Sequence, residues 1–364
     1  MRYLFLLFLA TTSIFSNIKF ISVVTEDAYN ILDLNGQNIS GPYPYAFTQN
    51  AQIATSPYGD IACLTNEDSL VGGCFLLFFD PLDFSVIGSS YNGVAYFYNG
   101  GITSDGKIAS AAEFGGNGVV RNTNLREMSY TDIPGLNFYG SKISNNGEFI
   151  CGVSSYDRGI IYNLNSGNSI SIKKIDGTTL LDCYTFCISS DSTKIYVSPP
   201  YTNPDGSYIY VIDSQTGVEI DKIDTSSFTS NSTFIYRMQP SPTDSKLALA
   251  VRTGGGQQIW ILDLITNSFN EVPSLFTTCR GYGVIGKMEF SEDETSLYTY
   301  SLLSLYKINL NNFTHELITE FNTNILSIAL GKIVPEPIKK GRQQLPLSGF
   351  NSQVKLNVSR SGLN

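Results

Sequence analysis

Three tyrosines recur at one position of the sequence, five residues before a repeated serine. They are Tyr139, Tyr184 and Tyr236, which precede Ser144, Ser189 and Ser241. A tyrosine ring stacks on sugars and peptides while its hydroxyl forms hydrogen bonds. Neighbouring connections and long loops add further residues of the kind that anchors ligands: Arg237, Arg280, Tyr282, Tyr201 and Arg252. The set predicts a ligand-binding surface near one mouth of the central channel that the structural repeats described below would enclose. The alternative is that the tyrosines only pack one structural repeat against the next.

Covalent chemistry finds little support in the residue types. His315 is the only histidine, and it lies on a predicted outer strand beside a glycosylation motif. A Ser-His-Asp or Cys-His arrangement needs an imidazole next to the nucleophile. The G-x-G-x-x-G match that starts at Gly281 continues into a strand, whereas a dinucleotide site needs a helix there. The sequence therefore predicts no catalytic residue, no metal ligand and no cofactor.

Six cysteines follow the first sixteen residues, an even number that permits three disulfide bridges. Cys63 and Cys74 fall on adjacent predicted strands, so we expect a bridge between them across a hairpin. Cys183 and Cys187 lie four residues apart on one strand, about 13 Å, which is too far for a direct bond. Buried thiols are the alternative reading for several of these cysteines. Their spacing does not suit zinc.

Four sequons predict N-linked glycosylation, at Asn38, Asn231, Asn312 and Asn357. We expect Asn38 and Asn312 in turns or outer strands, where a glycan would meet solvent. The prediction applies only if the host glycosylates such motifs.

A pattern of turns and strands repeats along the chain and would hold these residues in place. Polar turns followed by apolar strands begin at Ser56, Ser104, Ser144, Ser189, Ser241 and Ser291, at intervals of 40 to 52 residues. Such a period is typical of a β-propeller, whose four-stranded blades stack because none can bury its faces alone. The repeat at Ser189 predicts strands at 194–197, 208–213 and 218–223, because β-branched and aromatic residues alternate between turn formers.

A seventh unit is split between the chain ends. Residues 28–33 look like the third strand of a blade, while residues 324–330 look like a lone first strand. Pairing them would close the ring and remove exposed sheet edges. We therefore predict an all-β, seven-bladed propeller over residues 17–334, with six or eight blades as alternatives and an irregular β-sandwich assembly as the competing fold.

The first sixteen residues predict a secretory signal peptide, with a basic start and an apolar run from Leu4 to Ala10. This run is too short for a membrane span, which needs about 20 apolar residues. An uncleaved signal that acts as an anchor is the alternative. We expect a secreted or cell-surface protein without a transmembrane span, and the sequence leaves its oligomeric state open.

The charge of the chain argues against nucleic acid as a partner. Its formal net charge is −9, which would repel a phosphate backbone. Residues 335–364 are instead basic and contain prolines, so we predict an extended or partly disordered tail.

Residues 194–223, with a Tyr-Val strand, an Ile-Tyr-Val-Ile-Asp strand and a Thr-Gly turn, resemble the YVTN repeats of secreted and surface-layer propellers. These repeats belong to the wider WD40-like superfamily, although the Gly-His and Trp-Asp pairs of WD40 repeats proper are absent. The resemblance implies a propeller fold and extracellular interaction, and it carries no catalytic residues.

We therefore expect a binding or scaffold module for an extracellular protein or carbohydrate. The alternative is an extracellular hydrolase or lactonase-like enzyme with a metal held by acidic residues at the channel mouth.

Overall fold

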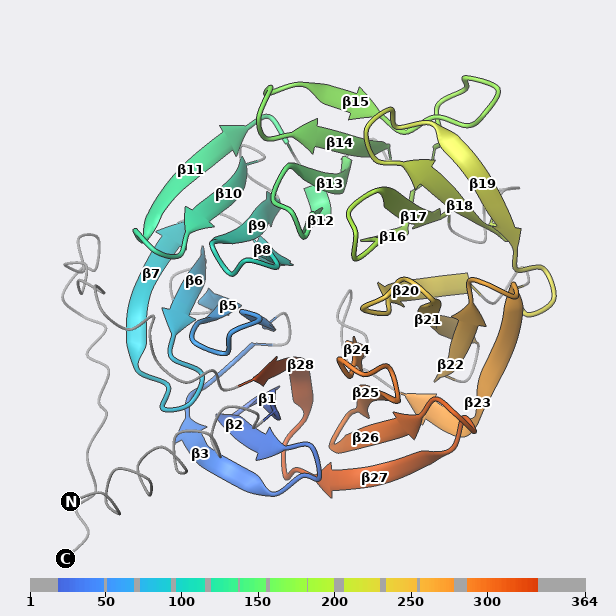
Figure 1. The fold of residues 1–364 in the computed structure, drawn as a ribbon. Coiled ribbons are helices and arrows are strands. Elements are labelled where there is room, and N and C mark those ends of the chain that lie inside the picture. Colours follow the sequence, from blue (N-terminus) through green and yellow to red (C-terminus); the bar gives the residue numbers. More distant parts are fainter. Residues whose placement is uncertain are drawn as a thin grey trace, which may run out of the picture.

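The strands of this protein form a ring of seven blades around a central axis (Figure 1). The computed structural model describes residues 19–48, 51–68, 73–92, 96–114, 119–136, 138–154, 158–181, 183–199, 206–229, 234–253, 256–277 and 287–332. Each blade is an antiparallel sheet of four strands. The seven-bladed propeller predicted from the repeat period is confirmed. The predicted signal peptide and basic tail lie outside the described residues.

One blade is assembled from both ends of the described chain, and we call it the closing blade. Its strands run in the order β28 (Ile325–Lys332), β1 (Lys19–Thr25), β2 (Ala28–Asp33) and β3 (Asn38–Pro44). Strand β28 lies innermost, and Lys332 pairs with Lys19 at one end of the β28–β1 ladder. The predicted split is confirmed, because a late strand completes a sheet that the early chain begins.

The other six blades each use four consecutive strands, the first of them innermost (Figure 1). The first two are β4 (Gln52–Thr55), β5 (Ala62–Asp68), β6 (Gly73–Phe79), β7 (Val86–Asn92), and β8 (Tyr96–Ile102), β9 (Ile108–Phe114), β10 (Val119–Asn124), β11 (Ser129–Pro134). The next two are β12 (Phe138–Ile143), β13 (Phe149–Ser154), β14 (Gly159–Asn163), β15 (Ser169–Ser171), and β16 (Thr185–Ile188), β17 (Lys194–Ser198), β18 (Tyr208–Asp213), β19 (Glu219–Asp224). The last two are β20 (Phe234–Pro240), β21 (Lys246–Thr253), β22 (Gly256–Asp263), β23 (Ser268–Thr277), and β24 (Glu289–Phe290), β25 (Ser296–Ser301), β26 (Ser304–Asn309), β27 (His315–Glu320).

The hydrophobic core lies between blades rather than within one. In a middle strand such as β18, four consecutive residues from Ile209 to Ile212 are buried, because neighbouring blades cover both faces of the sheet. The outer strand β19 instead alternates only partly and leaves Ile220 exposed. One apolar cluster joins Tyr196 and Ile209 of one blade to Leu249 of the next. Each blade therefore depends on its neighbours for burial.

The repeated serine turns join the first and second strands of the six consecutive blades, and we call them the inner turns. In each, the N–H of the first residue donates to the carbonyl of the residue five positions later. Its own carbonyl accepts the N–H of the residue three positions later. That third residue has positive φ in every inner turn: Gly59, Gly106, Gly147, Ser192, Asp244 and Glu294. One predicted position is wrong by one residue. Thr103, not Ser104, begins the turn of the β8–β11 blade, since a threonine hydroxyl accepts the same hydrogen bonds as serine.

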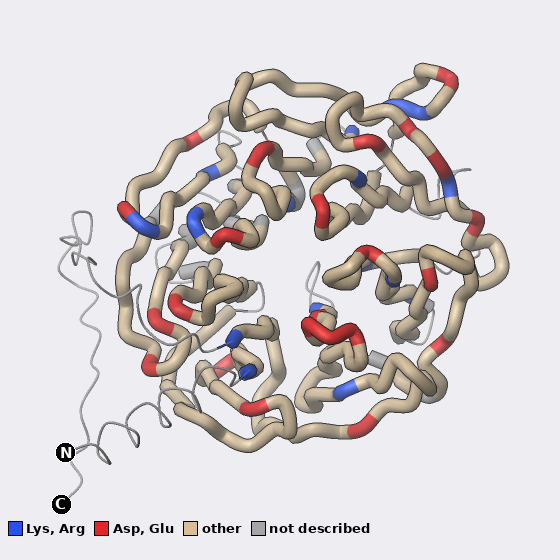
Figure 2. Tube along the Cα trace, in the orientation of Figure 1, with Lys and Arg blue, Asp and Glu red and all other residues tan. Residues whose placement is uncertain are grey.

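Adjacent inner turns contact each other around the axis. Ser104 N–H donates to the Asn145 carbonyl, and Asn145 donates to the Ser190 carbonyl at 2.9 Å. Two further blade-to-blade links are made to carboxylates, from Ser190 N–H to Asp244 at 2.7 Å and from Thr243 N–H to Glu294 at 2.5 Å. Acidic residues consequently collect on the inner turns around the axis (Figure 2).

The ring of inner turns is completed at the closing blade, which has no inner turn of its own. Glu292 forms ion pairs with Lys19 at 3.3 Å and with Lys332 at 3.6 Å, so one carboxylate holds β1 and β28 together. On the other side Gly59 lies against the Lys332 carbonyl, and a Cβ there would stand only 2.1 Å from that oxygen. The position requires glycine for this close approach as well as for its φ of 62°.

A second turn, between the third and fourth strands, recurs in all seven blades, and we call it the outer turn. Each outer turn begins with Asp or Asn, whose side-chain oxygen accepts a backbone N–H two to four residues later, at Asp33, Asp80, Asn124, Asn163, Asp213, Asp263 and Asn309. A residue of positive φ follows three or four positions after it: Gly36, Phe84, Met128, Gly167, Gly217, Asn267 and Phe313. Unlike the inner turn, the outer turn is also present in the closing blade, where it begins at Asp33.

The predicted disulfide bridge between Cys63 and Cys74 is wrong. Both residues lie on adjacent strands, β5 and β6, but Cys63 pairs in register with Phe78 and Cys74 with Glu67. They are thus four positions apart along the ladder, about 13 Å, beyond the reach of a disulfide. Cys63 is a buried thiol, as are Cys151, Cys183 and Cys187.

Within the described part of the chain, no helix has the length and apolarity needed to cross a membrane.

Candidate functional site

The face opposite the inner turns carries the connections between second and third strands, and we call it the loop face. Tyr184 directly precedes β16, and Tyr236 lies near the start of β20, so both stand where the innermost strands begin on this face. The predicted placement of these tyrosines is therefore observed. Tyr139 also lies near the start of its strand, β12, although the structure does not describe its side chain.

Four side chains of the loop face form one group, which we call the aromatic cluster. Its members come from two adjacent blades: Tyr184, Phe234, Tyr236 and Arg252. Tyr184 meets Phe234 edge to face at 5.3 Å between ring centroids, and it meets Tyr236 in the same manner at 5.4 Å. The Arg252 guanidinium lies 5.8 Å from the centre of the Phe234 ring. Edge-to-face rings and a cation near a ring face are both favourable geometries.

The backbone explains how these side chains meet. The Tyr184 N–H donates to the Ser198 carbonyl at 3.1 Å, which extends the β16–β17 ladder by one residue onto the loop face. Phe234 and Arg252 are paired in register across β20 and β21, so the cation lies beside its ring. The register shifts between Ile235 and Arg237, and Tyr236 falls at this irregularity. Residues two apart on a strand lie on the same face, so Phe234 and Tyr236 can both reach Tyr184.

Tyr184 combines burial with access. Its side chain is 43% exposed, whereas Phe234 is only 8% exposed. Burial of the phenol raises the pKa of Tyr184 above its usual range, and the neighbouring Tyr236 adds to the shift. The hydroxyl stays protonated and shares a side-chain hydrogen bond with Tyr236. The cluster presents one accessible aromatic residue on an apolar and cationic base.

Arg237 is not part of the aromatic cluster, although it follows Tyr236 in the chain. It lines a cavity on the propeller axis together with Lys142, Lys287 and residues of other innermost strands. Adjacent strand residues point in different directions, so the neighbours Tyr236 and Arg237 serve different sites. The other predicted site residues, Tyr201, Arg280 and Tyr282, lie outside the described residues.

Sequence reasoning missed three residues that a count from the inner turns could have found. Lys287 precedes Ser291 by four residues, just as Arg237 precedes Ser241. Lys142 lies two residues before Ser144. In another blade Glu289 holds the equivalent position, two residues before Ser291. Phe234 lies two residues before Tyr236 on the same strand.

Two of the predicted glycosylation sites are described, and both asparagines are exposed. Asn38 begins the outer strand β3, and Asn312 lies in the outer turn between β26 and β27. The Asn312 side-chain oxygen accepts hydrogen bonds from the N–H and hydroxyl of Thr314, at 3.1 and 2.8 Å. Their expected placement in turns or outer strands is confirmed. Asn231 and Asn357 lie outside the described residues.

The described residues contain no group of three or more His, Cys, Asp or Glu side chains that could hold a metal ion.

Comparison with known proteins supports the fold and no particular activity. No protein-family model matches the chain, and no curated protein matches its sequence. A functionally unknown protein from Desulfotomaculum acetoxidans superposes with a TM-score of 0.61 at 13% identity, over 86% of this chain and 99% of that one. Kuenenia stuttgartiensis hydrazine synthase gives a TM-score of 0.56 at 14% identity, over 75% of this chain and 80% of that one.

A third similar structure is the β-propeller domain of Myceliophteria thermophila Cps50 (Swd1). It has a TM-score of 0.53 and 10% identity, with 73% of this chain and 84% of that chain covered. The chain thus shares the β-propeller fold of these structures. The specific likeness to YVTN repeats stays a prediction from residues 194–223.

Proposed function

We propose that this protein is a secreted or cell-surface binding module that captures an extracellular protein through the aromatic cluster on its loop face. The observation that carries the proposal is the position of Tyr184, a 43% exposed side chain that is braced by Phe234 and Tyr236. Aromatic residues and arginine supply most of the binding energy of protein interfaces. The cluster contains both.

The surroundings of Tyr184 favour recognition over packing alone. Two edge-to-face contacts hold the ring in place before a ligand arrives, so little side-chain freedom is left to lose on binding. The cluster also lies on the strands of two adjacent blades, which give it a rigid scaffold. A protein partner would bury the exposed part of the Tyr184 ring.

Two features of the sequence support secretion. Residues 1–16 have the composition of a signal peptide, and Asn38 and Asn312 present sequons on exposed outer segments. The proposed partner is accordingly extracellular.

The alternative function, a metal-dependent hydrolase or lactonase-like enzyme, would need acidic ligands at the channel. Acidic residues do collect on the inner turns around the axis (Figure 2), but the described lining of the axial cavity carries Lys142, Arg237 and Lys287. Ammonium and guanidinium groups repel a metal cation. This difference favours the binding module.

The first prediction concerns Tyr184. Replacement by alanine of a tyrosine that dominates a protein interface lowers the binding free energy by about 2 kcal/mol or more, which is roughly 30-fold in affinity. We expect Tyr184→Ala to lose capture of the secreted proteins that wild-type protein retains on a column. The measurement is quantitative mass spectrometry of the retained proteins, followed by the affinity of the strongest one. The melting temperature is measured on the same samples.

Tyr130→Ala is the matched control, because Tyr130 is a 57% exposed tyrosine on the outer strand β11, outside the cluster. It should leave capture unchanged. Equal capture by Tyr184→Ala and Tyr130→Ala, with a lower melting temperature only for Tyr184→Ala, would assign the tyrosines to blade packing instead. Retention of a glycan but no protein would move the ligand to the carbohydrate class.

A further inference from the structure

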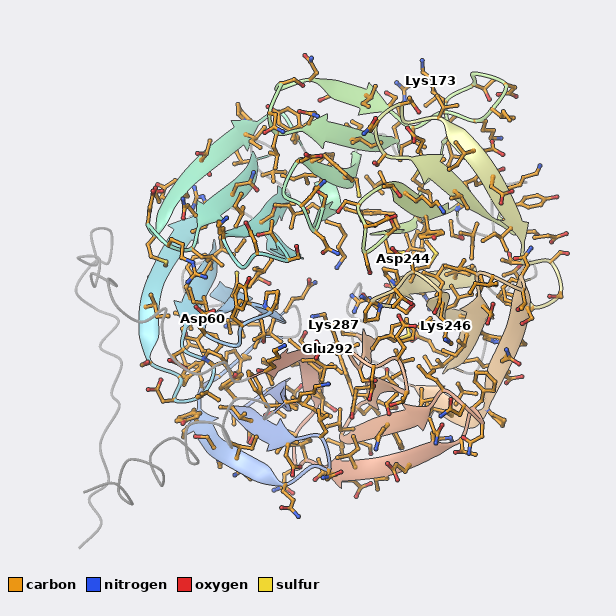
Figure 3. The ribbon with its side chains drawn as sticks, viewed as in Figure 1. Asp60, Lys173, Asp244, Lys246, Lys287 and Glu292 are labelled. Atoms are coloured by element: carbon orange, nitrogen blue, oxygen red, sulfur yellow. The ribbon has the colours of Figure 1, made fainter. Side chains whose placement is uncertain are left out.

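The innermost strands enclose a small cavity on the propeller axis. Its lining comes from six of the seven blades: Gln52, Ile53, Ala54, Gly101, Lys142, Arg237, Lys287 and Ser327. Its volume is about 40 Å³. A water molecule needs roughly 10–15 Å³ on this measure, so the cavity has room for about three waters or one compact ion. Lys287 lies close to the axis, near the edge of the central opening (Figure 3).

Three of the lining side chains carry positive charge, on three different blades. The Lys287 ammonium is neutralised, because it pairs with Glu289 at 2.7 Å and donates to the Ile53 carbonyl at 2.8 Å. Lys142 and Arg237 form no hydrogen bond or ion pair with any residue that the structure describes. Glu289 is thus one carboxylate facing three cations.

This concentration of positive charge is costly without a counterion. Burial, together with the nearby charges of Arg237 and Lys287, lowers the pKa of Lys142 to about 8, although Glu289 acts in the opposite direction. Like charges in a low-dielectric site repel each other more strongly than in water. The chain as a whole is acidic, with 32 Asp and Glu against 23 Lys and Arg, so the cluster does not follow from composition.

The uncompensated groups are also arranged as donors. Arginine offers a planar fork of N–H groups that matches the oxygens of phosphate or carboxylate, and lysine adds a point charge. The Ser327 hydroxyl is buried at the cavity wall, where its oxygen accepts the Ile53 N–H at 3.2 Å and leaves its proton to donate. Every one of these polar groups can donate to one small acceptor.

We propose that the channel cavity binds one compact oxyanion, of the phosphate or carboxylate type, held between Lys142, Arg237 and Lys287. The oxyanion is either a free inorganic ion or a carboxylate or phosphate group presented by a bound molecule. The site is separate from the aromatic cluster, so it does not depend on the proposed function.

The test uses the full mature chain in a low-salt buffer free of phosphate and carboxylates. Inorganic phosphate and acetate are titrated in separate arms, with sodium chloride at equal ionic strength as the reference. Affinity is measured by calorimetry and the melting temperature by differential scanning. We expect at least one of the two oxyanions to raise the melting temperature beyond the chloride reference. Saturation by phosphate alone or by acetate alone identifies the type of oxyanion.

Substitutions separate this site from general electrostatics. Lys142→Met and Arg237→Met should each weaken the oxyanion at least tenfold, whereas Lys142→Arg should largely retain it. Lys173→Met is the matched control, because Lys173 is an exposed lysine on the outer rim, far from the axis (Figure 3). It should bind as wild type does.

Folding defects are distinguishable from loss of the site. Without oxyanion, Lys142→Met should melt no lower than wild type, since it removes a repelled, buried charge. Three results would overturn the proposal: no stabilisation beyond chloride in either arm, an equal affinity in Lys142→Met and Lys173→Met, or a lower melting temperature of Lys142→Met in oxyanion-free buffer.

Discussion

The carboxylates of the inner turns differ in the direction in which their surroundings shift their pKa. Asp293 accepts the Ser291 hydroxyl at 2.6 Å and the N–H and hydroxyl of Thr295, and these hydrogen bonds lower its pKa to about 2. Asp244 accepts two N–H groups of the neighbouring blade, but burial raises its pKa instead. Two residues at the same mouth therefore respond to acid in opposite directions.

This difference predicts how stability depends on pH. The folded pKa of Asp293 lies below its ordinary value near 3.8, so its stabilising effect is present above about pH 4 and is lost as the pH falls towards 2. We expect Asp293→Asn to lose less melting temperature than wild type between pH 4 and pH 2. Thermal denaturation at intervals across this range measures the effect.

Asp244→Asn is the control, with the opposite sign. Because the pKa of Asp244 is raised in the folded state, its protonation stabilises the fold as the pH falls. Removal of this carboxylate should therefore leave the loss of melting temperature between pH 4 and pH 2 unchanged or make it larger. An identical loss in the Asp293→Asn protein and wild type would contradict the assigned hydrogen bonds.

At the candidate site, sequence counting succeeded where one repeat sets the position. Tyr184 and Tyr236 could be placed because each stands five residues before an inner turn, which fixes where on its strand it lies. Lys142 and Lys287 could not be brought together in this way. They come from non-adjacent blades, and only closure of the ring brings them to one axial cavity.

At the scale of the strand and turn, the outer turns are the most regular element of the fold. Asp213 shows their chemistry: its side-chain oxygen accepts the N–H groups of Gln215 and Thr216 and the Thr216 hydroxyl, the latter at 2.7 Å. Gly217 then takes a φ of 69° to return the chain into β19. Asn serves in place of Asp in three of the seven blades, which shows that the turn needs the oxygen rather than the charge.

Substitution of Asp213 tests this requirement. Asp213→Ala removes the acceptor of these hydrogen bonds and should lower the free energy of unfolding by about 1 kcal/mol. Asp213→Asn keeps the acceptor and should cost less than half as much. Urea denaturation of the three proteins measures both values. Equal destabilisation by the two substitutions would show that the charge, not the oxygen, stabilises the turn.

Local pattern was sufficient to predict many strands but not their alignment. Strand β18 spans Tyr208–Asp213, the range predicted from its alternating β-branched and aromatic residues and its flanking turns. Register is a different property, set by the turn and by the facing strand. The prediction for Cys63 and Cys74 failed for this reason: they were assigned correctly to adjacent strands, but the ladder separates them by four positions.

At the scale of the whole molecule, closure depends on one strand from the end of the described chain. Strand β28 pairs with β1 along its length and buries Ile325, Leu326 and Ile328. It also supplies Lys332 to the ion pairs with Glu292. The split unit could be predicted because a ring without this pairing would leave an open sheet edge. The repeat period was visible separately, in the spacing of the serine turns.

Truncation tests the closure directly. A chain that ends at Thr323 lacks β28, exposes the edge of β1 and opens the axial cavity, so we expect insoluble or aggregated protein. A chain that ends at Pro337 retains β28 and should express and melt like the full chain. Solubility, light scattering and melting temperature compare the two. A stable monomer that ends at Thr323 would contradict the requirement for β28.

The pairing of Lys19 with Lys332 also determines how the ring would respond to mechanical load. Both ends of the described chain leave the closing blade at the same end of the β28–β1 ladder. A force that pulls these ends apart therefore acts on one hydrogen-bonded pair at a time, as in a zipper, rather than on all pairs in parallel. The two ion pairs of Glu292 lie at the first step of this opening. Tension on the chain ends would thus be resisted first by a single carboxylate, and the ring would open at its seam before any other blade came apart.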